Sequence, residues 1–236
     1  MKLSTLLKSA SALTGALVMA MSAANVQAAC VDNVVLVHGN AGNPGHWDNT
    51  YNKLRSKGYS SSQIFRPKWG SLNAAINNHS GSEETPVRNA INSAISSSCT
   101  GKIDVIGHSM GVTLAAQQII KLGKTSKVDS FVGIAGAYRG LLTCGIYPAA
   151  VLTPSCGRDG LSISSPFLDW LYGKKIANRV YSIKSWVDQV VCATGTCLVY
   201  GKHSSQIAGE RASYSYGYGH LGLQKYTSSK QYDLIK

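Results

Sequence analysis

The 236-residue chain has few acidic residues and almost no long apolar segments. It carries 11 aspartates and glutamates against 23 lysines and arginines, a formal net charge of +12. The basic residues are scattered, without a run of five or six and without a recognisable nucleic-acid module, so no nucleic-acid partner is expected. Beyond residue 30 no apolar run approaches the roughly 18 residues of a transmembrane helix. We expect a soluble protein with a basic surface that can adsorb to lipid or anionic surfaces.

Metal-binding patterns are also missing from the sequence. No cysteine pair has the C-x-x-C spacing and no histidine cluster accompanies the cysteines, so a zinc site is not expected. No acidic cluster indicates a calcium site, and the sequence predicts no metal and no cofactor. In an exported chain an even number of cysteines indicates disulfides, and six cysteines permit fifteen connectivities. The cysteines are Cys30, Cys99, Cys144, Cys156, Cys192 and Cys197.

The N-terminal segment has the organisation of an export signal. Lys2 and Lys8 form a short positive region, and the apolar run "LTGALVMAMSAA" follows it. Val26 and Ala28 then occupy the small-residue positions that signal peptidase reads. The sequence therefore predicts a signal peptide over residues 1–28, cleaved after Ala28 or after the alanine that follows it.

Residues 29–236 then form the mature protein, about 208 residues with a net charge of +10 once the two leader lysines are removed. This length suits one domain with a substantial core and is short for two. No internal repeat, low-complexity segment or linker interrupts it. We expect a secreted monomer, either extracellular or periplasmic, built as a single domain.

Strand-like and helix-like segments alternate along the mature chain. Valine- and isoleucine-rich runs of this kind are typical of strands buried on both faces, and they occur at 31–40, 102–107, 128–137 and 179–186, with a shorter one at 63–69. Helical spacing of apolar residues separates them, at 44–59, 84–99 and 108–123. This alternation predicts an α/β fold with a mainly parallel sheet covered by helices on both faces. Residues 139–175 break the rhythm, and we expect a small cap-like excursion above the sheet.

The stretch "IDVIGHSMGVTLAAQQII" predicts a nucleophile. A buried strand runs into Gly-His-Ser-Met-Gly, and an amphipathic helix follows at once. This is the nucleophile-elbow arrangement, in which the turn is so tight that Gly107 and Gly111 must be small. Ser109 then lies at a helix N-terminus, where backbone N–H groups favour developing negative charge.

A serine needs an imidazole as base and a carboxylate to orient that imidazole. In this architecture the acid and then the histidine follow the serine. His220 lies on a glycine-flanked loop near the end of the sequence, and Asp188 follows the last clear strand at its carboxyl end, where open α/β sheets place their sites. We predict Ser109, Asp188 and His220 as the catalytic triad. His46, His79 and His203 are interpreted as surface histidines, and His108 is expected to point away from the serine.

The oxyanion hole requires two backbone N–H groups in fixed positions. One belongs to the residue after the nucleophile, Met110, and the second to the loop after the first strand, at Asn40. Gly39 and Gly42 allow that loop to approach a substrate closely.

With these motifs in place, the chain resembles the class 2 lipase family of α/β-hydrolases, the compact secreted bacterial lipases. "VVLVHGNAG" resembles the family's oxyanion strand, "IDVIGHSMG" its elbow and "VGIAGAYRG" the strand that follows. "SIKSWVDQVV" is similar to the acid segment, and "GHLGL" with "YTSSKQYDLI" to the histidine loop and terminal helix. The resemblance implies hydrolysis of an ester substrate at a lipid or polymer boundary, without cofactor. Asn40 departs from the pattern, where an apolar residue is expected.

In this fold the strands near Cys30 and Cys99 are neighbours, and both cysteines fall at the same sheet edge, which predicts a Cys30–Cys99 bridge. Cys144–Cys156 would tie the excursion, and Cys192–Cys197 would brace the loop after the acid.

Two other functions compete with a lipase or carboxylesterase. Aromatic residues such as Trp186 and Tyr147, with the alternating Tyr214, Tyr216 and Tyr218, would suit a polyester depolymerase or cutinase-like enzyme with the same triad, although alternating tyrosines are also typical of a half-buried strand. A non-catalytic, envelope-binding module on the same scaffold is disfavoured, since the sequence retains every residue of the triad.

Overall fold

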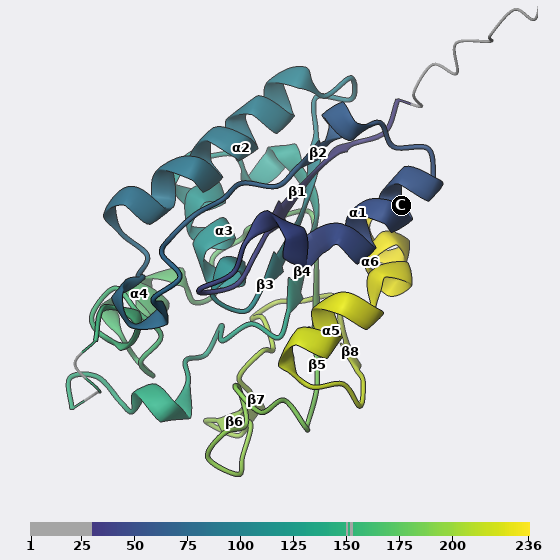
Figure 1. The fold of residues 1–236 in the computed structure, drawn as a ribbon. Coiled ribbons are helices and arrows are strands. Elements are labelled where there is room, and N and C mark those ends of the chain that lie inside the picture. Colours follow the sequence, from purple (N-terminus) through teal and green to yellow (C-terminus); the bar gives the residue numbers. More distant parts are fainter. Residues whose placement is uncertain (1–29, 150, 152) are drawn as a thin grey trace, which may run out of the picture.

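A computed structural model describes residues 30–149, 151 and 153–236, so the predicted signal peptide lies outside the described residues. Six parallel strands form the central sheet in the order β2-β1-β3-β4-β5-β8 (Figure 1). Their bounds are β1 Asn33–Val37, β2 Ile64–Phe65, β3 Ile103–His108, β4 Val128–Ile134, β5 Arg179–Lys184 and β8 Ala212–Ser215. The predicted parallel α/β sheet is confirmed.

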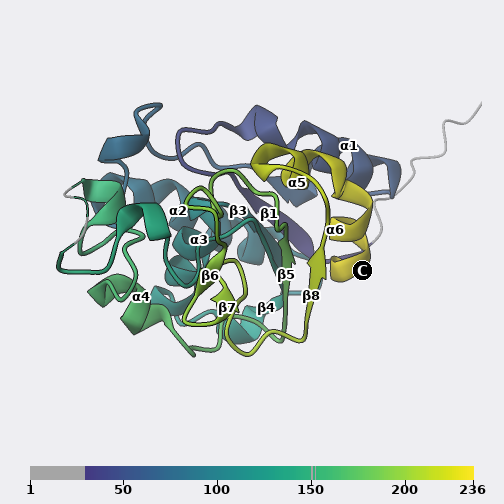
Figure 2. The same cartoon turned by 90° about the horizontal axis from the view of Figure 1, so that it is seen from below.

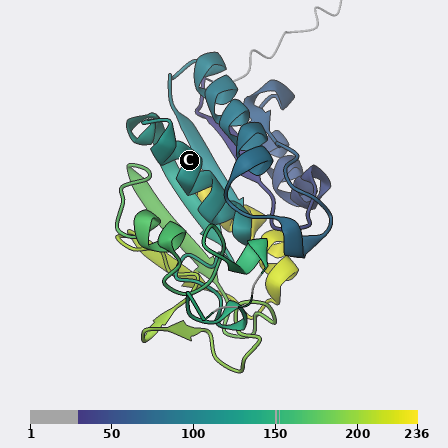
Figure 3. The same ribbon diagram turned by 90° about the vertical axis from the view of Figure 1, so that its left-hand side faces the viewer.

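Helices cover both faces of this sheet because its central strands are apolar on both faces. Val34 and Leu36 of β1 face one core with Trp47, Leu54 and Leu234, and Val35 and Val37 face the other, with residues of α2 and α3. The helices α1 Asp48–Ser56, α5 His220–Tyr226 and α6 Ser228–Ile235 cover the first face. The second is covered by α2 Glu84–Ser97 and α3 Met110–Lys121, which lie in front of the strands in Figure 3.

The first and last helices of the domain are joined directly. Thr50 Oγ1 of α1 donates a hydrogen bond of 2.6 Å to Gln231 Oε1 of α6, and both side chains are buried. Asn49 Nδ2 of α1 donates to the Lys225 carbonyl of α5 at 3.1 Å. These contacts fix α5, and therefore its first residue, His220, against the start of the domain.

The excursion at 139–175 packs onto the second face of the sheet. It contains the 3-10 turns Leu142–Cys144 and Pro154–Cys156 and the helix α4 Pro166–Leu171, which the sequence did not predict. Phe167, Leu168 and Leu171 of α4 are buried in the core with α2 and α3. The short antiparallel ribbon of β6 Leu198–Val199 and β7 Lys202–His203 lies below the end of β5 in Figure 1 and in front of it in Figure 2.

Three disulfides are present: Cys30–Cys99, Cys144–Cys156 and Cys192–Cys197. They are the three pairs predicted above, and they indicate an oxidising compartment. Among the described residues, no helix combines the length and apolar character that crossing a bilayer requires.

Candidate active site

Ser109 sits in a strained turn between β3 and α3. Its φ of 54° and ψ of −131° place it in a region that non-glycine residues rarely occupy, as a nucleophile elbow requires. Its N–H donates to the Ile134 carbonyl at 2.9 Å. A Cβ at Gly111 would lie 2.2 Å from the His38 carbonyl oxygen, and one at Gly107 would lie 2.7 Å from Val112 Cα. The two glycines are therefore sterically required.

Asp188 and His220 meet at the carboxyl edge of the sheet. His220 Nδ1 lies 3.0 Å from Asp188 Oδ1 and 2.9 Å from Oδ2, and both residues are buried. The N–H groups of Val190 and Val191 donate to Asp188 Oδ1, each at 2.9 Å. Burial raises the pKa of Asp188, but its hydrogen bonds from His220 and from these N–H groups outweigh burial, and the net pKa is lowered. The carboxylate therefore stays ionised and holds Nδ1–H, which leaves His220 Nε2 free to accept a proton.

His108 supports His220, a contact that the sequence did not predict. The two ring centroids are 4.7 Å apart, and His108 Nε2 donates to the His220 carbonyl at 3.1 Å. Burial, assisted by the neighbouring His220, lowers the pKa of His108 to about 3. His108 thus remains neutral when a proton arrives on the ring beside it. No sequence spacing connects these two residues.

Ser109 is connected to His220 through its neighbour in sequence, His108. Within the described part of the chain, Ser109 Oγ makes no hydrogen bond to His220, although the ring of His108, the residue before the serine, lies tilted against the His220 ring. Catalytic hydrogen bonds are often long without substrate and tighten in the complex.

The loop after β1 lies directly against Ser109. A Cβ at Gly39 would be 2.9 Å from Ser109 Cβ, so only glycine allows this approach. The Asn40 side chain turns away into a polar bridge: its Nδ2 donates to the Ala74 carbonyl at 2.9 Å, and its Oδ1 accepts from Asn77 Nδ2 at 2.6 Å. This bridge accounts for a polar residue at position 40. Met110 begins α3, where backbone N–H groups lack partners within the helix.

A family model described as lipase (class 2) matches residues 32–233 of the chain. The chain belongs to the class 2 lipase family. Solved structures of α/β-hydrolases share its fold. One is a monoacylglycerol lipase from Paleococcus ferrophilus, at 13% identity and a TM-score of 0.56 over 86% of this chain and 93% of that one. Another is the mature lipase BlEst2 from Bacillus licheniformis, at 11% identity and a TM-score of 0.59 over 88% and 93%. No curated protein sequence matches the chain.

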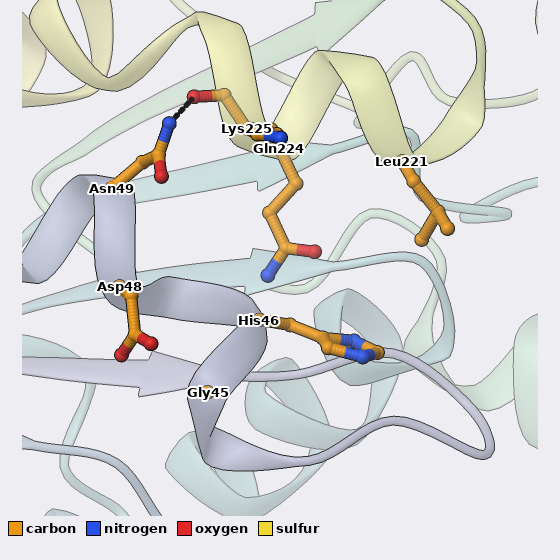
Figure 4. A pocket seen from close by; sticks show the side chains of 7 residues that line it. All are labelled: Gly45, His46, Asp48, Asn49, Leu221, Gln224 and Lys225. Atoms are coloured by element: carbon orange, nitrogen blue, oxygen red, sulfur yellow. Dashed lines mark hydrogen bonds between the residues drawn. The ribbon is translucent and has the colours of Figure 1, made fainter.

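A pocket of about 340 Å³ opens beside the histidine helix of this class 2 lipase (Figure 4). His46 and Asp48 line it from the segment after the oxyanion loop, and Leu221 and Gln224 line it from α5. In Figure 4 the His46 ring and the Leu221 side chain both project toward the open side between the two segments. The pocket thus offers mixed polar and apolar walls one residue away from His220.

The turn that carries Asp188 is held by contacts from His203 and Cys192. His203 Nε2 donates to the Ser185 carbonyl at 3.1 Å, and its ring lies edge-on to Trp186 at 4.8 Å. The Cys192 N–H donates to the Asp188 carbonyl at 2.9 Å. His203 was interpreted as a surface histidine, and this was wrong: it is 2% exposed, and burial lowers its pKa.

His79 is also buried, at 1% exposure, instead of lying on the surface. Its Nδ1 donates to the Asp159 carbonyl at 2.9 Å, and its Nε2 lies 2.7 Å from Thr113 Oγ1. His79 therefore links the excursion to Thr113, near the start of α3. Its polar neighbours in sequence gave no sign of this, because the burial comes from the packing of α4 over it, with the Phe167 ring stacked at 4.0 Å.

Proposed function

We propose that this class 2 lipase is a secreted carboxylic-ester hydrolase that acts through Ser109, His220 and Asp188. The observation that carries the proposal is the His220–Asp188 pair, with Nδ1 2.9 Å from Oδ2, beside a strained serine at the carboxyl edge of a parallel sheet. Membership of a lipase family makes an ester the expected substrate.

Acylation begins when Ser109 Oγ attacks the ester carbonyl carbon. His220 Nε2 takes the serine proton, and the ionised Asp188 stabilises the imidazolium that forms. The carbonyl oxygen becomes an oxyanion, which the backbone N–H groups of Asn40 and Met110 stabilise. His220 then gives its proton to the departing alcohol, and an acyl-Ser109 intermediate remains.

Deacylation repeats these steps with water. His220 removes a proton from the attacking water, the same N–H groups stabilise the second oxyanion, and the acid leaves as Ser109 recovers its proton. His108 stays neutral throughout, since its pKa is about 3, and does not compete for the proton.

An apolar acyl group suits the rim of the proposed site. Trp186 and Val187, on the acid turn, are 56% and 61% exposed, and Leu221, beside the base, is 57% exposed. Exposed apolar side chains of this kind are typical of a surface that meets a lipid or ligand. Together with the net positive charge, they support adsorption of a monomeric enzyme to lipid or anionic surfaces.

Export of the enzyme is supported by the three disulfides, which require an oxidising compartment. The signal peptide over residues 1–28 supplies the route in this proposal.

Hydrolysis of matched chromogenic esters, with short and long acyl chains, tests the proposal. Native protein, Ser109→Ala and the control Ser62→Ala, an exposed serine in a surface turn, are compared under the same conditions. We expect hydrolysis that falls at least a thousandfold in Ser109→Ala, of the order seen when a triad residue is removed, and is unchanged in the control.

Preference for long acyl chains would support a lipase. A preference for short acyl chains with the same dependence on Ser109 would favour the polyester hydrolase. The exposed Trp186 supports this alternative, and a polymer-film assay would test it next. No turnover of either ester, or no effect of Ser109→Ala, would refute the triad and leave the non-catalytic binding module.

A further inference from the structure

Three aspartates converge at the amino end of the sheet, opposite the edge that carries the triad. Asp32 precedes β1, Asp104 is the second residue of β3, and Asp129 is the second residue of β4. One carboxylate oxygen from each lies within 4.8 Å of the others. They come from separate segments of the sequence, so no local acidic cluster reveals them.

A β-bulge brings the central pair together. Ile103 is paired with Val128 and Val105 with Phe131, so two residues of β4, Asp129 and Ser130, lie opposite Asp104 alone. The Ser130 N–H donates to Asp104 Oδ1 at 2.9 Å. The bulge thus places an extra oxygen-bearing residue against a buried carboxylate.

Two oxygen atoms in this cluster have no protein partner. Asp104 is 1% exposed, and its Oδ2 makes no hydrogen bond to any described residue; the same holds for Ser130 Oγ, which is fully buried. Burial and then the neighbouring Asp32 raise the pKa of Asp104. The Ser130 side chain lies close enough to the Asp104 carboxyl to lower this pKa in part. Buried oxygens without partners are destabilising unless a ligand, an ion or a proton satisfies them.

We propose that Asp32, Asp104 and Asp129, with the Ser130 hydroxyl, form a binding site for a calcium ion. The donors are all oxygens, which hard cations prefer, and oxygens at Ca–O distances of 2.3–2.6 Å can lie up to about 5 Å apart. An ion there bridges β1, β3 and β4 at the end remote from the ester-hydrolysis site.

Access to the site is provided by a pocket of about 370 Å³ lined by Asp32 and Asp129. Tyr59, Thr100 and the end of α6, marked C in Figure 1, also border it. Water in this pocket can complete the calcium coordination, which requires six to eight oxygens.

Neighbouring cations set the expected strength of binding. Arg179 Nη2 lies 2.7 Å from Asp129 Oδ2, and Lys102 Nζ lies 3.9 Å from Asp129 Oδ1. Against these two charges, three ionised aspartates leave one net negative charge. Lys57 and Lys236 also line the pocket. A low net charge gives weak binding, and we expect a dissociation constant in the range of about 10⁻⁴–10⁻³ M that is typical of extracellular calcium modules.

Differential scanning calorimetry of the mature, disulfide-bonded protein tests the site. Chelator-treated protein is scanned in calcium chloride up to about 10 mM, against sodium chloride of matched ionic strength, a range that spans the expected dissociation constant. We expect a rise in Tm of roughly 3 °C or more in calcium alone, which grows with the logarithm of the calcium concentration above the dissociation constant. Ester hydrolysis at moderate temperature should not depend on calcium, so this test is independent of the proposed catalytic function.

Asp104→Asn and Asp32→Asn should each weaken the apparent calcium affinity at least tenfold. Asp48→Asn, which removes an exposed carboxylate paired with Arg66 elsewhere on the protein, is the matched control and should respond like the native protein. Asp32 is only partly buried, so Asp32→Asn should disturb folding less. If Asp104→Asn does not fold, Asp32→Asn alone tests the site. A Tm equal in both salts, or a calcium response that persists in Asp32→Asn, would overturn the site and leave a proton on Asp104 as the explanation.

Discussion

Replacing Gly111 by alanine should displace the oxyanion loop. The added Cβ would lie 2.2 Å from the His38 carbonyl oxygen and 2.6 Å from that of Val37, both backbone atoms. Ordinary van der Waals contact begins at about 3.4 Å, so the end of β1 must move by about 1 Å relative to α3. The loop that carries Asn40 follows β1 directly, and it moves with the strand.

The magnitude of the effect follows from this displacement. A misplacement of about 1 Å in a catalytic arrangement costs on the order of 10² in rate, and loss of one oxyanion donor costs about 10²–10³ in kcat. Overpacking also destabilises the fold by about 1–3 kcal/mol. For a domain of this size each kcal/mol corresponds to about 2–4 °C in Tm. We therefore expect kcat to fall at least a hundredfold, with a Tm several degrees lower.

Ester hydrolysis and calorimetry of Gly111→Ala measure both quantities. Gly217→Ala is the control, because a Cβ at Gly217 meets nothing within 4 Å and its backbone is not in the left-handed region. If Gly111→Ala retained the native kcat and Tm while the control behaved as expected, the steric account of the elbow would be refuted.

The remaining predictions concern the acid, a buried histidine and the disulfides. Asp188→Asn should lower kcat by on the order of 10⁴, because an amide favours the wrong imidazole tautomer; steady-state hydrolysis measures this, and a loss under tenfold would contradict the role of Asp188. Burial lowers the pKa of His79 from 6.5 to about 4, so as the pH falls the unfolded chain takes up a proton on this histidine before the folded protein does. The free energy of unfolding should therefore fall by about 1 kcal/mol for each unit that the pH drops between about 6.5 and 4. Urea unfolding should show a shallower pH slope in His79→Gln, and equal slopes would refute this. Removing the Cys30–Cys99 bridge, whose cysteines are 69 residues apart, should lower the free energy of unfolding by about 4 kcal/mol with little effect on kcat. Removing the Cys192–Cys197 bridge, whose cysteines are 5 residues apart, should lower it by about 2 kcal/mol. The second change should also lower kcat, because this bridge braces the turn that carries Asp188. Calorimetry and ester hydrolysis of the two double alanine variants compare the bridges. A larger loss of stability without Cys192–Cys197, or a larger loss of kcat without Cys30–Cys99, would contradict the prediction.

Local patterns predicted the parallel sheet, which is confirmed, and they pointed to Ser109, Asp188 and His220 as triad candidates. Runs rich in valine and isoleucine are typical of strands buried on both faces, and β1 lies inside the sheet, between β2 and β3. Ser109 was predictable because the elbow restricts residues on both sides of it in sequence. Asp188 and His220 followed from their order along the chain, and the structure places them 2.9 Å apart.

Features that depend on packing between distant segments were not predictable. His79 and His203 have polar sequence neighbours, yet α4 and the acid turn bury them. His108 contacts a residue 112 positions later, which no periodicity reports. The aspartate cluster depends on a bulge in β4, and a bulge leaves no pattern in a short strand. Helix α4 is too short, at six residues, to show helical periodicity.

If His220 is the base, as proposed above, the hydrogen bonds between α1 and the α5–α6 pair make hydrolysis depend on the last helices to be synthesised. The serine and the oxyanion loop are synthesised early, but the base becomes fixed only when the last helices dock against the first. Under the proposed mechanism, a chain in which α5 and α6 have not yet docked against α1 would therefore be catalytically silent. By the same reasoning, ester turnover under the proposed mechanism would report that α5 and α6 have docked against α1.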